Sequence, residues 1–424
     1  MNLLILCFGV GMGLGTLTTN SVFLEDFNPP QNTDSDASSV IQKAVNEAIF
    51  QGKPLIFPSG QRRLRIDSQI LISLDSQSSR LVIDGQGATI YPNFEGAGLF
   101  VKPLCPTSDI GSGREVAHFE INDLNFDGYF GSEKTRALKI GANGFAFSDF
   151  RQSFVQNSLL LGFKCHPILL EGSLTRNIHF RNVVSRSHGW EVVSNDGGFV
   201  GDMVFQNCEA SGEKVLDFLA SGKYKTSELR GIRIEQCNFY GGGISMFSGV
   251  FGRLADFWIT DTSVDQSKSP ALNVIGDGGK IHQLFVQNIY AVGFETPAIN
   301  IELDPASQSH SGQFVIRGGN ISSLKADSAI IANGVSQILL DGITFTDIYC
   351  RSAIKLQASK SQVYNCNSMN LSGLNPDYLI ELLEGSSDMI LSNNVADVYN
   401  DLILDSSRDL SNAFFGNKRN GAIQ

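Results

Sequence analysis

The chain has 424 residues, of which 42% are hydrophobic and 18% are charged, and its formal net charge is −11 at pH 7. This composition allows a large core, and 43 glycines against 12 prolines suit many tight turns without a collagen-like or disordered character. The acidic balance argues against nucleic acid and against an anionic membrane surface as partners, although a local basic patch could still bind an anionic glycan.

The first segment, from Met1 to Leu17, is apolar and rich in glycine. It lacks the basic start and the A-x-A cleavage site of a signal peptide, and it is short for a membrane span. Two interpretations stay open for residues 1–20. One is a secretory leader, which would make the protein extracellular. The other is an apolar arm that packs on the first coil or on a neighbouring subunit. We expect no membrane insertion of the mature domain in either case.

The segment from Asp34 to Gly52 predicts one amphipathic helix. Its apolar residues recur at helical spacing, namely Val40, Ile41, Ala44, Val45, Ala48 and Ile49. Asp34, Ser35 or Asp36 can cap the start of the helix, and Gly52 can end it. A stacked fold exposes its core at the first coil, so we expect this helix to cover that end. Residues 21–75 would then form an N-terminal segment that contains a capping helix.

Short strands with alternating apolar residues recur along most of the chain. Residues 178–195 contain one such strand, a polar corner at Asn182, a small-residue turn and a second strand, and residues 203–221 repeat this order. Corresponding strands lie about 23 to 30 residues apart, which suits a parallel β-helix better than propeller blades. The chain is therefore predicted to be all-β, with a single-stranded right-handed parallel β-helix (a solenoid) at 76–412 and a C-terminal tail at 413–424.

The corners between strands carry amides and carboxylates that can form ladders from coil to coil. These residues are Asn182, Asn207, Asp261, Asn288, Asp341, Asn365 and Asn393. Cys208 and Cys366 each follow such a corner, at the position that Val183 and Ile289 occupy in other coils. We therefore expect both cysteines to be small apolar core residues rather than disulfide partners. The seven cysteines show no CxxC or metal-ligand spacing.

The beginning of the chain carries a family resemblance. The capping helix is followed by P-L-I-F-P-S-G at 54–60 and by the strand L-V-I-D-G-Q-G at 81–87. This order, over about the first hundred residues, resembles the pectate-lyase-like right-handed β-helix proteins, which include polysaccharide lyases, glycosidases and phage tailspikes. The resemblance implies a polysaccharide substrate or ligand, an extracellular or virion-surface location, and a homotrimer if the protein is tailspike-like.

Aligning the second strand of each coil predicts which side chains face outward. The first buried position is apolar in every coil, and its residues are Ile168, Trp190, Leu216, Ile244, Leu272, Ile299, Ile330, Ile354 and Leu379. Side chains alternate along a strand, so the next residue faces solvent. Glu191 and Asp217 hold that outward position on consecutive coils, on strands about 4.8 Å apart.

Two neighbouring carboxylates can provide an acid and a base, because both cannot ionise comfortably. A carboxyl separation of about 5 to 5.5 Å suits a retaining glycosidase, and one of about 6.5 to 9.5 Å suits an inverting one. Glu191 with Asp217 fits the first class, and Glu171 with Asp217, two coils apart, fits the second. The alternative interpretation is that like charges share a solvated sheet face by chance.

Two further segments resemble polygalacturonase-type glycosidases. S-H-G-W-E-V-V-S at 187–194 is similar to their G-H-G strand, and G-I-R-I at 231–234 is similar to their later R-I-K strand. The resemblance implies that His188 assists the carboxylates and that Arg233 binds a substrate carboxylate. The N-T-D and D-D motifs of that family are absent from the coils before the histidine. A corner histidine satisfied by the backbone is the alternative for His188.

Other outward residues complete the predicted substrate-binding set. Trp258 and Phe285, on adjacent coils, could stack on sugar rings or form a subunit contact. A lyase would instead use a basic residue, with Arg181, Arg233 and Lys214 as candidates. No metal site or cofactor motif is recognisable. We therefore expect a polysaccharide-degrading glycoside hydrolase, with a polysaccharide lyase or a trimeric tailspike-like glycan-binding protein as alternatives.

Overall fold

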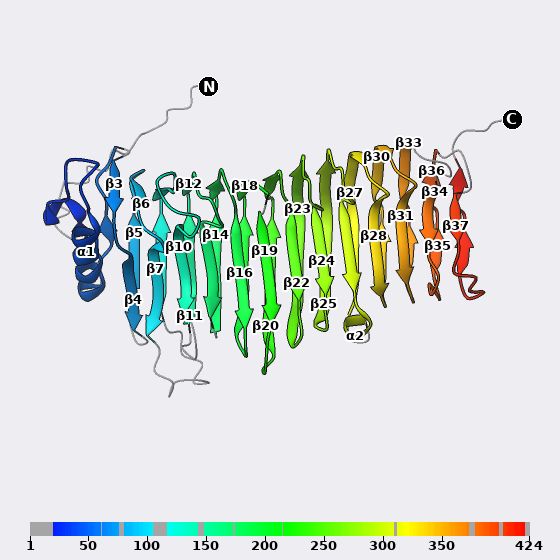
Figure 1. Ribbon diagram of the computed structural model, residues 1–424, viewed down its shortest axis with the longest axis horizontal. Helices are drawn as coiled ribbons and strands as arrows, with labels where there is room; N and C mark the ends of the chain where they lie inside the picture. The colour runs from blue at the N-terminus through cyan, green and yellow to red at the C-terminus, as the bar shows by residue number, and fades with distance from the viewer. Residues whose placement is uncertain are drawn as a thin grey trace, which may run out of the picture.

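The computed structural model describes residues 20–60, 62–75, 80–104, 117–142, 148–172, 174–213, 215–308, 312–372, 378–397 and 402–419. These residues wind into a right-handed parallel β-helix whose coils are stacked in sequence order from one end to the other (Figure 1). The structure therefore confirms the predicted all-β, single-stranded solenoid. In the described ranges, no helix is long and apolar enough to span a membrane.

One face of the solenoid is a parallel sheet of thirteen described strands. Its strands, in order along the stack, are β4 (Ile70–Asp75), β7 (Ala97–Leu104), β10 (Arg136–Ala142), β13 (Ile168–Gly172), β16 (Trp190–Asn195), β19 (Leu216–Ser221), β22 (Ile244–Ser248), β24 (Leu272–Gly276), β26 (Ile299–Leu303), β28 (Ser328–Val335), β31 (Ser352–Ala358), β34 (Tyr378–Leu382) and β37 (Ile403–Asp405). Each strand pairs in parallel with the equivalent strand of the next coil, so equivalent residues form columns along the face.

The other strands form one 26-stranded sheet that bends around two further faces. One face consists of β1 (Val22–Phe23), β2 (Leu55–Ile56), β5 (Arg80–Asp84), β8 (His118–Asn122), β11 (Ser148–Gln156), β14 (Leu174–Arg181), β17 (Phe199–Gln206), β20 (Ser227–Glu235), β29 (Ile338–Asp341), β32 (Gln362–Tyr364), β35 (Ile390–Ser392) and β38 (Ala413–Phe415). The other consists of β3 (Arg63–Ile66), β6 (Thr89–Pro92), β9 (Asn125–Asp127), β12 (Leu159–Leu161), β15 (Val184–Ser185), β18 (Glu209–Ser211), β21 (Asn238–Tyr240), β30 (Thr344–Tyr349), β33 (Asn367–Ser372), β36 (Val395–Ala396) and β39 (Lys418–Arg419). Three long strands, β23 (Gly252–Asp265), β25 (Lys280–Val292) and β27 (Phe314–Lys325), run across both faces.

A complete coil thus has three strands, whereas the sequence predicts two. The additional strand follows the corner and is very short, as in β15 (Val184–Ser185) and β18 (Glu209–Ser211). Two or three residues are too few to display a period-two pattern, so this strand is invisible to a reading based on alternation. Pairing also continues into both flanking segments, because β4 (Ile70–Asp75) pairs with β7 and β38 (Ala413–Phe415) pairs with β35.

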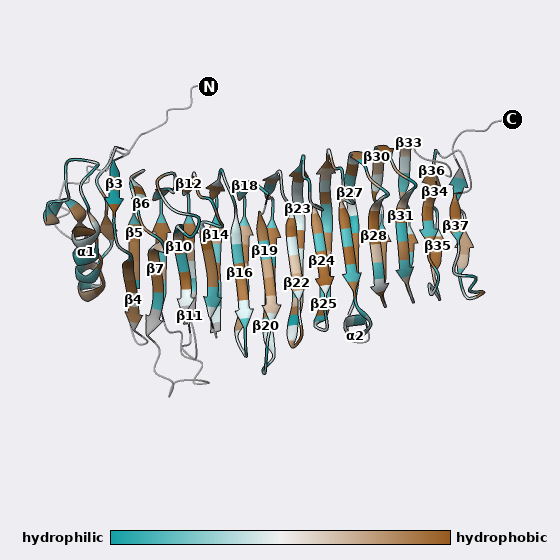
Figure 2. Ribbon diagram, in the orientation of Figure 1, coloured by the Kyte–Doolittle hydropathy of each residue, from teal (hydrophilic) through white to brown (hydrophobic). Residues whose placement is uncertain are grey.

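The inward column of the 13-stranded sheet has the predicted register from Ile168 to Ile354, and its members are buried. The last step is different, because Ile354 pairs with Ile380 and not with Leu379. Leu379 and Ile380 are both fully buried, so apolar character alone could not decide between them. Glu381 therefore pairs with Lys355 of the outward column, although it is only 3% exposed and forms an ion pair with Arg351. Figure 2 shows hydrophobic and hydrophilic residues interspersed along the strands of this sheet.

Aromatic side chains fill the core beneath the middle coils. Phe205 stacks on Phe180 with ring centroids 5.0 Å apart, and it contacts Trp190 at 5.6 Å and Phe218 at 6.2 Å. All four side chains are fully buried. Trp190 belongs to β16 and Phe218 to β19, so this cluster anchors two neighbouring strands of the 13-stranded sheet from the inside.

The polar corners adopt the left-handed backbone conformation that Asn tolerates better than most residues. Asn182 and Asn207 both have φ of 52°. The Asn182 amide donates to Asn157 Oδ1 at 2.9 Å, and the Asn288 amide donates to Asp261 Oδ1 at 2.9 Å. The predicted ladder of side-chain hydrogen bonds is therefore confirmed at these coils.

The cysteines behind the corners are core residues, as predicted. Cys208 and Cys366 are unpaired and fully buried, Cys237 is also unpaired and buried, and Cys350 is buried. Cys165 is unpaired and half-buried. Cys7 and Cys105 lie outside the described residues.

The predicted helix is α1 (Ser38–Gln51), which lies at the N-terminal end of the stack (Figure 1). Its buried face, which includes Ile41 and Val45, joins the core of the solenoid. The Asp36 carboxylate accepts the Ser38 N–H at 2.9 Å, and Gly52 ends the helix with φ of 63°. Its role as a lid over the first coil stays a prediction. Two short helices, η1 (Leu24–Phe27) and α2 (Pro305–Gln308), were not predicted.

Candidate functional site

The two predicted carboxylates are neighbours on the 13-stranded sheet. Glu191 of β16 pairs directly with Asp217 of β19, and each follows a fully buried inward residue, Trp190 or Leu216. The exposed fractions of the carboxylate side chains are 22% for Glu191 and 17% for Asp217. Both groups are therefore reachable from solvent and partly shielded from it.

A histidine that the sequence reading overlooked lies between these carboxylates. His166 Nδ1 is 3.9 Å from Glu191 Oε2, and His166 Nε2 is 3.4 Å from Asp217 Oδ2. The imidazole is only 9% exposed. A protonated imidazole in this position would attract both carboxylates, and a neutral one could pass a proton between them.

Arg136 supplies a permanent positive charge to the same cluster. Its Nη2 donates to Glu191 Oε2 at 2.9 Å, and its Nη1 donates to the His166 carbonyl oxygen at 2.7 Å. The guanidinium thus holds both the Glu191 carboxylate and the backbone that carries the imidazole. The sequence reading treated the carboxylates as an isolated pair of like charges, whereas two basic side chains adjoin them.

These basic residues belong to one column that the alignment could have revealed. Ile168 pairs in register with Leu138 of the preceding coil and with Trp190 of the following coil. The residues two positions before these three are Arg136, His166 and His188. The rings of His166 and His188 lie 6.0 Å apart. The sequence reading followed only the columns after the first buried position, so it missed Arg136 and His166. Lys214 would be next in this column, but it lies outside the described residues.

His188 lies in the same region as the carboxylates, as predicted. It is half-buried, and its backbone carbonyl accepts a hydrogen bond from the Ser185 hydroxyl. Its Nδ1 is buried and has no hydrogen-bond partner among the described residues. The alternative interpretation, in which backbone groups satisfy the hydrogen bonds of a corner histidine, therefore does not explain the buried Nδ1 of the His188 ring.

Glu171 occupies a different outward column from the other two acids. It lies in β13, pairs with Val193, and forms an ion pair with Lys139, whose Nζ is 2.5 Å from Glu171 Oε1. It does not line the hollow that contains Glu191 and Asp217. The structure thus separates Glu171, which was predicted to pair with Asp217 in an inverting glycosidase, from the cluster around His166.

The cluster lies in a groove of about 1000 Å³ on the 13-stranded sheet. The side chains that line this groove include Arg136, Lys164, Cys165, His166, His188, Glu191, Glu213, Asp217, Leu219, Ser245, Phe247, Lys268, Asn273 and Ile275. A second hollow of about 430 Å³ shares Phe247 and Ile275 with it and continues to Glu302 and Asn333. Together they form a track along the coil stack, with the acids near one end and a partly apolar floor beyond them.

The remaining predicted binding residues lie on another face. Arg181, Arg233 and Trp258 belong to β14, β20 and β23 of the 26-stranded sheet, so they do not line the groove. The Arg233 guanidinium lies over the Trp258 ring, 5.6 Å from its centroid. Trp258 is half-buried and pairs with Phe285 on the next coil. The structure therefore places Arg233, which was expected to bind a substrate carboxylate, away from the groove, because β20 and the strands of the 13-stranded sheet form different faces of the solenoid.

Two titratable groups near these surfaces have altered proton affinities. Burial raises the pKa of the Cys165 thiol, and the Glu191 carboxylate adds to this effect while Arg136 opposes it. On the 26-stranded sheet, burial lowers the pKa of His179, and Arg181 and Arg233 lower it further. Among the residues described, no group of three or more His, Cys, Asp or Glu side chains could hold a metal ion.

Comparison with known proteins identifies the fold through structure alone. No family model matches the chain, and no curated protein matches its sequence. Tailspike protein 3 of bacteriophage CBA120 is 10% identical over 95% of this chain with a TM-score of 0.55, and this chain spans 62% of that protein's length. PfbA, a surface adhesin of Streptococcus pneumoniae, is 13% identical, with 87% of this chain and 92% of that one covered and a TM-score of 0.58.

The chain has the right-handed parallel β-helix fold that these two structures share. The predicted resemblance is therefore confirmed at the level of the fold. At these sequence identities the likeness describes the backbone, and the chemistry has to be argued from the side chains in the groove.

Proposed function

We propose that this protein is a polysaccharide-degrading enzyme, a glycoside hydrolase that binds its substrate in the groove of the 13-stranded sheet. The observation that supports this proposal is the cluster of Glu191, His166 and Asp217 in a groove of about 1000 Å³. The two carboxyl groups belong to adjacent strands, which lie about 4.8 Å apart in a parallel sheet, and neighbours on adjacent strands suit a retaining mechanism better than an inverting one.

The surroundings of the two acids suggest different roles for them. Glu191, bound to the Arg136 guanidinium, would remain a carboxylate and attack the anomeric carbon. Asp217 would give its proton to the departing glycosidic oxygen as that bond breaks. In the second half of the reaction, Asp217 would take a proton from the water that cleaves the glycosyl–Glu191 ester. This restores both groups, and His166 would position them throughout.

One observation favours a second candidate, a glycan-binding protein that does not cleave its ligand. The Glu191 carboxylate forms an ion pair with Arg136, whereas a nucleophilic carboxylate has to be free to attack the substrate. Two of the similar structures are a tailspike and a surface adhesin. Such a protein would work on a virion or cell surface, and a homotrimer would be its expected assembly if it is tailspike-like. The lyase alternative is weaker, because Arg181 and Arg233 lie away from the groove.

Product analysis tests the proposal. The protein is incubated with a panel of capsular and plant polysaccharides, and the products are assayed for reducing ends and for unsaturated ends that absorb in the near ultraviolet. A hydrolase gives only reducing ends, a lyase gives both, and a binding protein leaves the polymer intact.

The site is tested with Asp217→Asn and Glu191→Gln, each expected to lower turnover at least about 100-fold. Glu235→Gln, an outward carboxylate on the 26-stranded sheet, is the matched control and should cleave normally. Unchanged cleavage by both groove variants would contradict the assignment of Glu191 and Asp217 as the catalytic residues.

A further inference from the structure

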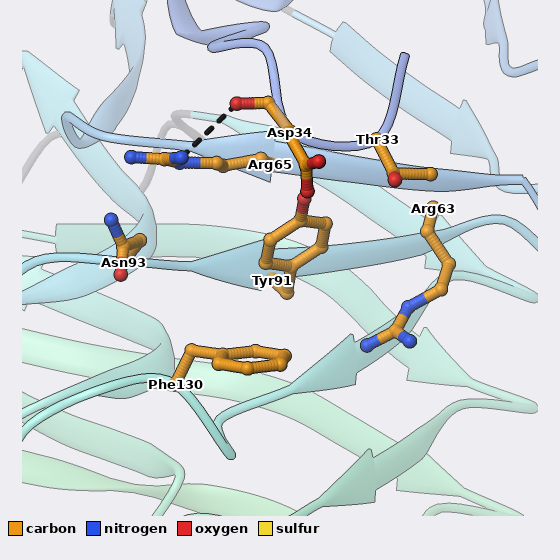
Figure 3. A pocket seen from close by; sticks show the side chains of 7 residues that line it. All are labelled: Thr33, Asp34, Arg63, Arg65, Tyr91, Asn93 and Phe130. Carbon is orange, nitrogen blue, oxygen red and sulfur yellow. Dashed lines mark hydrogen bonds between the residues drawn. The ribbon is translucent and has the colours of Figure 1, made fainter.

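Another hollow, separate from the groove and its continuation, lies near the N-terminal end of the stack, on the face formed by β3, β6 and β9. It has a volume of about 200 Å³ and is lined by Asp34, Arg63, Arg65, Tyr91, Asn93 and Phe130, together with Thr33. Figure 3 shows these side chains around the hollow, with polar groups on one side and Phe130 on the other. None of them belongs to the groove of the carboxylates. We call this hollow the arginine–aromatic pocket.

The polar groups of the arginine–aromatic pocket are held in fixed positions. Arg63 Nη2 is 2.7 Å from Asp127 Oδ2, and its guanidinium lies over the Tyr91 ring, 5.3 Å from the centroid. Arg65 Nε donates to Asp67 at 2.7 Å, and its Nη1 donates to the Asp34 carbonyl at 3.0 Å, the bond drawn in Figure 3. Such preorganised donors and acceptors lose little entropy when they bind a ligand.

Aspartates offset both arginine charges of this pocket. Each arginine has an aspartate partner, Asp127 or Asp67, and the Asp34 carboxyl adds one more acid to the lining. No arginine charge is thus left over for an anionic ligand. Planar polar groups in this arrangement can instead bind adjacent hydroxyl groups, donating from the guanidinium and accepting at the carboxylate.

The aromatic residues provide the other half of a sugar site. Tyr91 is only 7% exposed and forms a wall, whereas Phe130 is 57% exposed and Tyr129 is 72% exposed. The Phe130 ring lies 6.0 Å from Tyr91 and 5.2 Å from Tyr129. Burial and the Asp34 carboxylate raise the pKa of the Tyr91 hydroxyl, so it stays neutral at physiological pH. An exposed aromatic face attracts the weakly positive C–H face of a pyranose ring, as it attracts other positive groups.

We infer that the arginine–aromatic pocket is an accessory binding site for one uncharged pyranose unit of a glycan. Its hydroxyl groups would meet Arg63, Asp34 and Asn93, and its apolar face would lie on Phe130. The size of the pocket limits the site to about one ring. The further statement that this ring belongs to the polymer held in the groove rests on the proposed function.

The chain connects the pocket to the groove through a single turn. This turn, between β9 and β10, carries Phe130 and leads into Arg136, which adjoins Glu191. Lys164, a residue of the groove, donates from its Nζ to the Gly131 carbonyl at 3.2 Å. The two sites therefore lie on either side of one short segment, which suits a polymer that crosses it.

The inference is tested by affinity electrophoresis in gels that contain dextran, mannan, galactan or glucomannan, all uncharged, or alginate or polygalacturonate, both acidic. Asp217→Asn serves as the parent, so that the polymer is not consumed, and the assay needs no catalysis. Phe130→Ala in this parent should weaken retardation by an uncharged polymer about tenfold. Tyr224→Ala, which removes a ring that is 74% exposed on a different turn, is the matched control and should migrate as the parent does.

Two results would overturn the inference. One is that no uncharged polymer retards the parent, and the other is that Phe130→Ala is retarded as strongly as the parent. Weaker retardation of Phe130→Ala by the acidic polymers alone would also contradict the inference, because that result would indicate a site for anions. These outcomes are separate from the test of the groove, which depends on cleavage by the Asp217 and Glu191 variants. In the otherwise wild-type enzyme, Phe130→Ala should raise KM for the polymer and leave kcat unchanged.

Discussion

The aromatic cluster beneath the groove predicts an unusually costly core substitution, Phe205→Ala. Removing a buried phenylalanine side chain costs about 3–5 kcal/mol through lost burial and the cavity that remains. Phe205 also contacts three rings, at 5.0, 5.6 and 6.2 Å. Aromatic pairs contribute about 0.5–1.5 kcal/mol each beyond burial. We therefore expect Phe205→Ala to lower the free energy of unfolding by about 1.5–4.5 kcal/mol more than the same change at a phenylalanine without ring contacts.

The matched control is Phe314→Ala. Phe314 is fully buried, and within the described part of the chain it has no ring contact. Unfolding in urea is followed by tryptophan fluorescence, since Trp190 lies inside the cluster, and the free energies are compared at equal slopes. Equal losses in the two variants, to within about 0.5 kcal/mol, would refute the idea that ring contacts stabilise these coils.

Three other predictions follow from single residues. Iodoacetamide should label Cys165 slowly at pH 7 and faster with each added pH unit, because the raised pKa of its thiol keeps the thiolate scarce. The labelling rate is measured by mass spectrometry, and a rate that does not change with pH would contradict this prediction. Asn182→Ala should lower the free energy of unfolding by about 1–2 kcal/mol, since it places alanine at φ of 52° and removes the bond to Asn157. Asn182→Gly should lower the free energy of unfolding by less than Asn182→Ala does, and an equal decrease would count against backbone strain as the cause. Arg233→Met should leave turnover on polysaccharide within about twofold of wild type, because Arg233 lies away from the groove; a large loss of reducing-end production would place the active site on the other face.

The repetitive part of the structure could be predicted because each coil repeats the same physical demands. One inward aliphatic column fixes the outward neighbours, so Glu191 and Asp217 could be paired without coordinates. The corner amides and the buried thiol of Cys208 followed from the same repeat. The alignment failed at Ile380, where two consecutive buried residues made the period ambiguous.

The site itself could be predicted only in part. Arg136 is the first residue of β10 and His166 precedes β13, so neither lies within a run of alternating residues, and their side chains reach across one or two coils to the carboxylates. Arg233 was assigned from resemblance to a strand motif, which says nothing about the face that the strand occupies. The direction of a side chain near a turn depends on the bend of the backbone, and the spacing of hydrophobic residues does not determine that bend.

The pairing of Glu191 with Asp217 has a consequence for how such a site can change. Strands of neighbouring coils are held at one fixed interval by their backbone hydrogen bonds. The distance between two functional groups on this face can therefore alter only in whole multiples of that interval, by gain or loss of a complete coil. Gradual drift of loops, which reshapes most enzyme clefts, can adjust what surrounds the two acids here but not the separation of the strands that carry them.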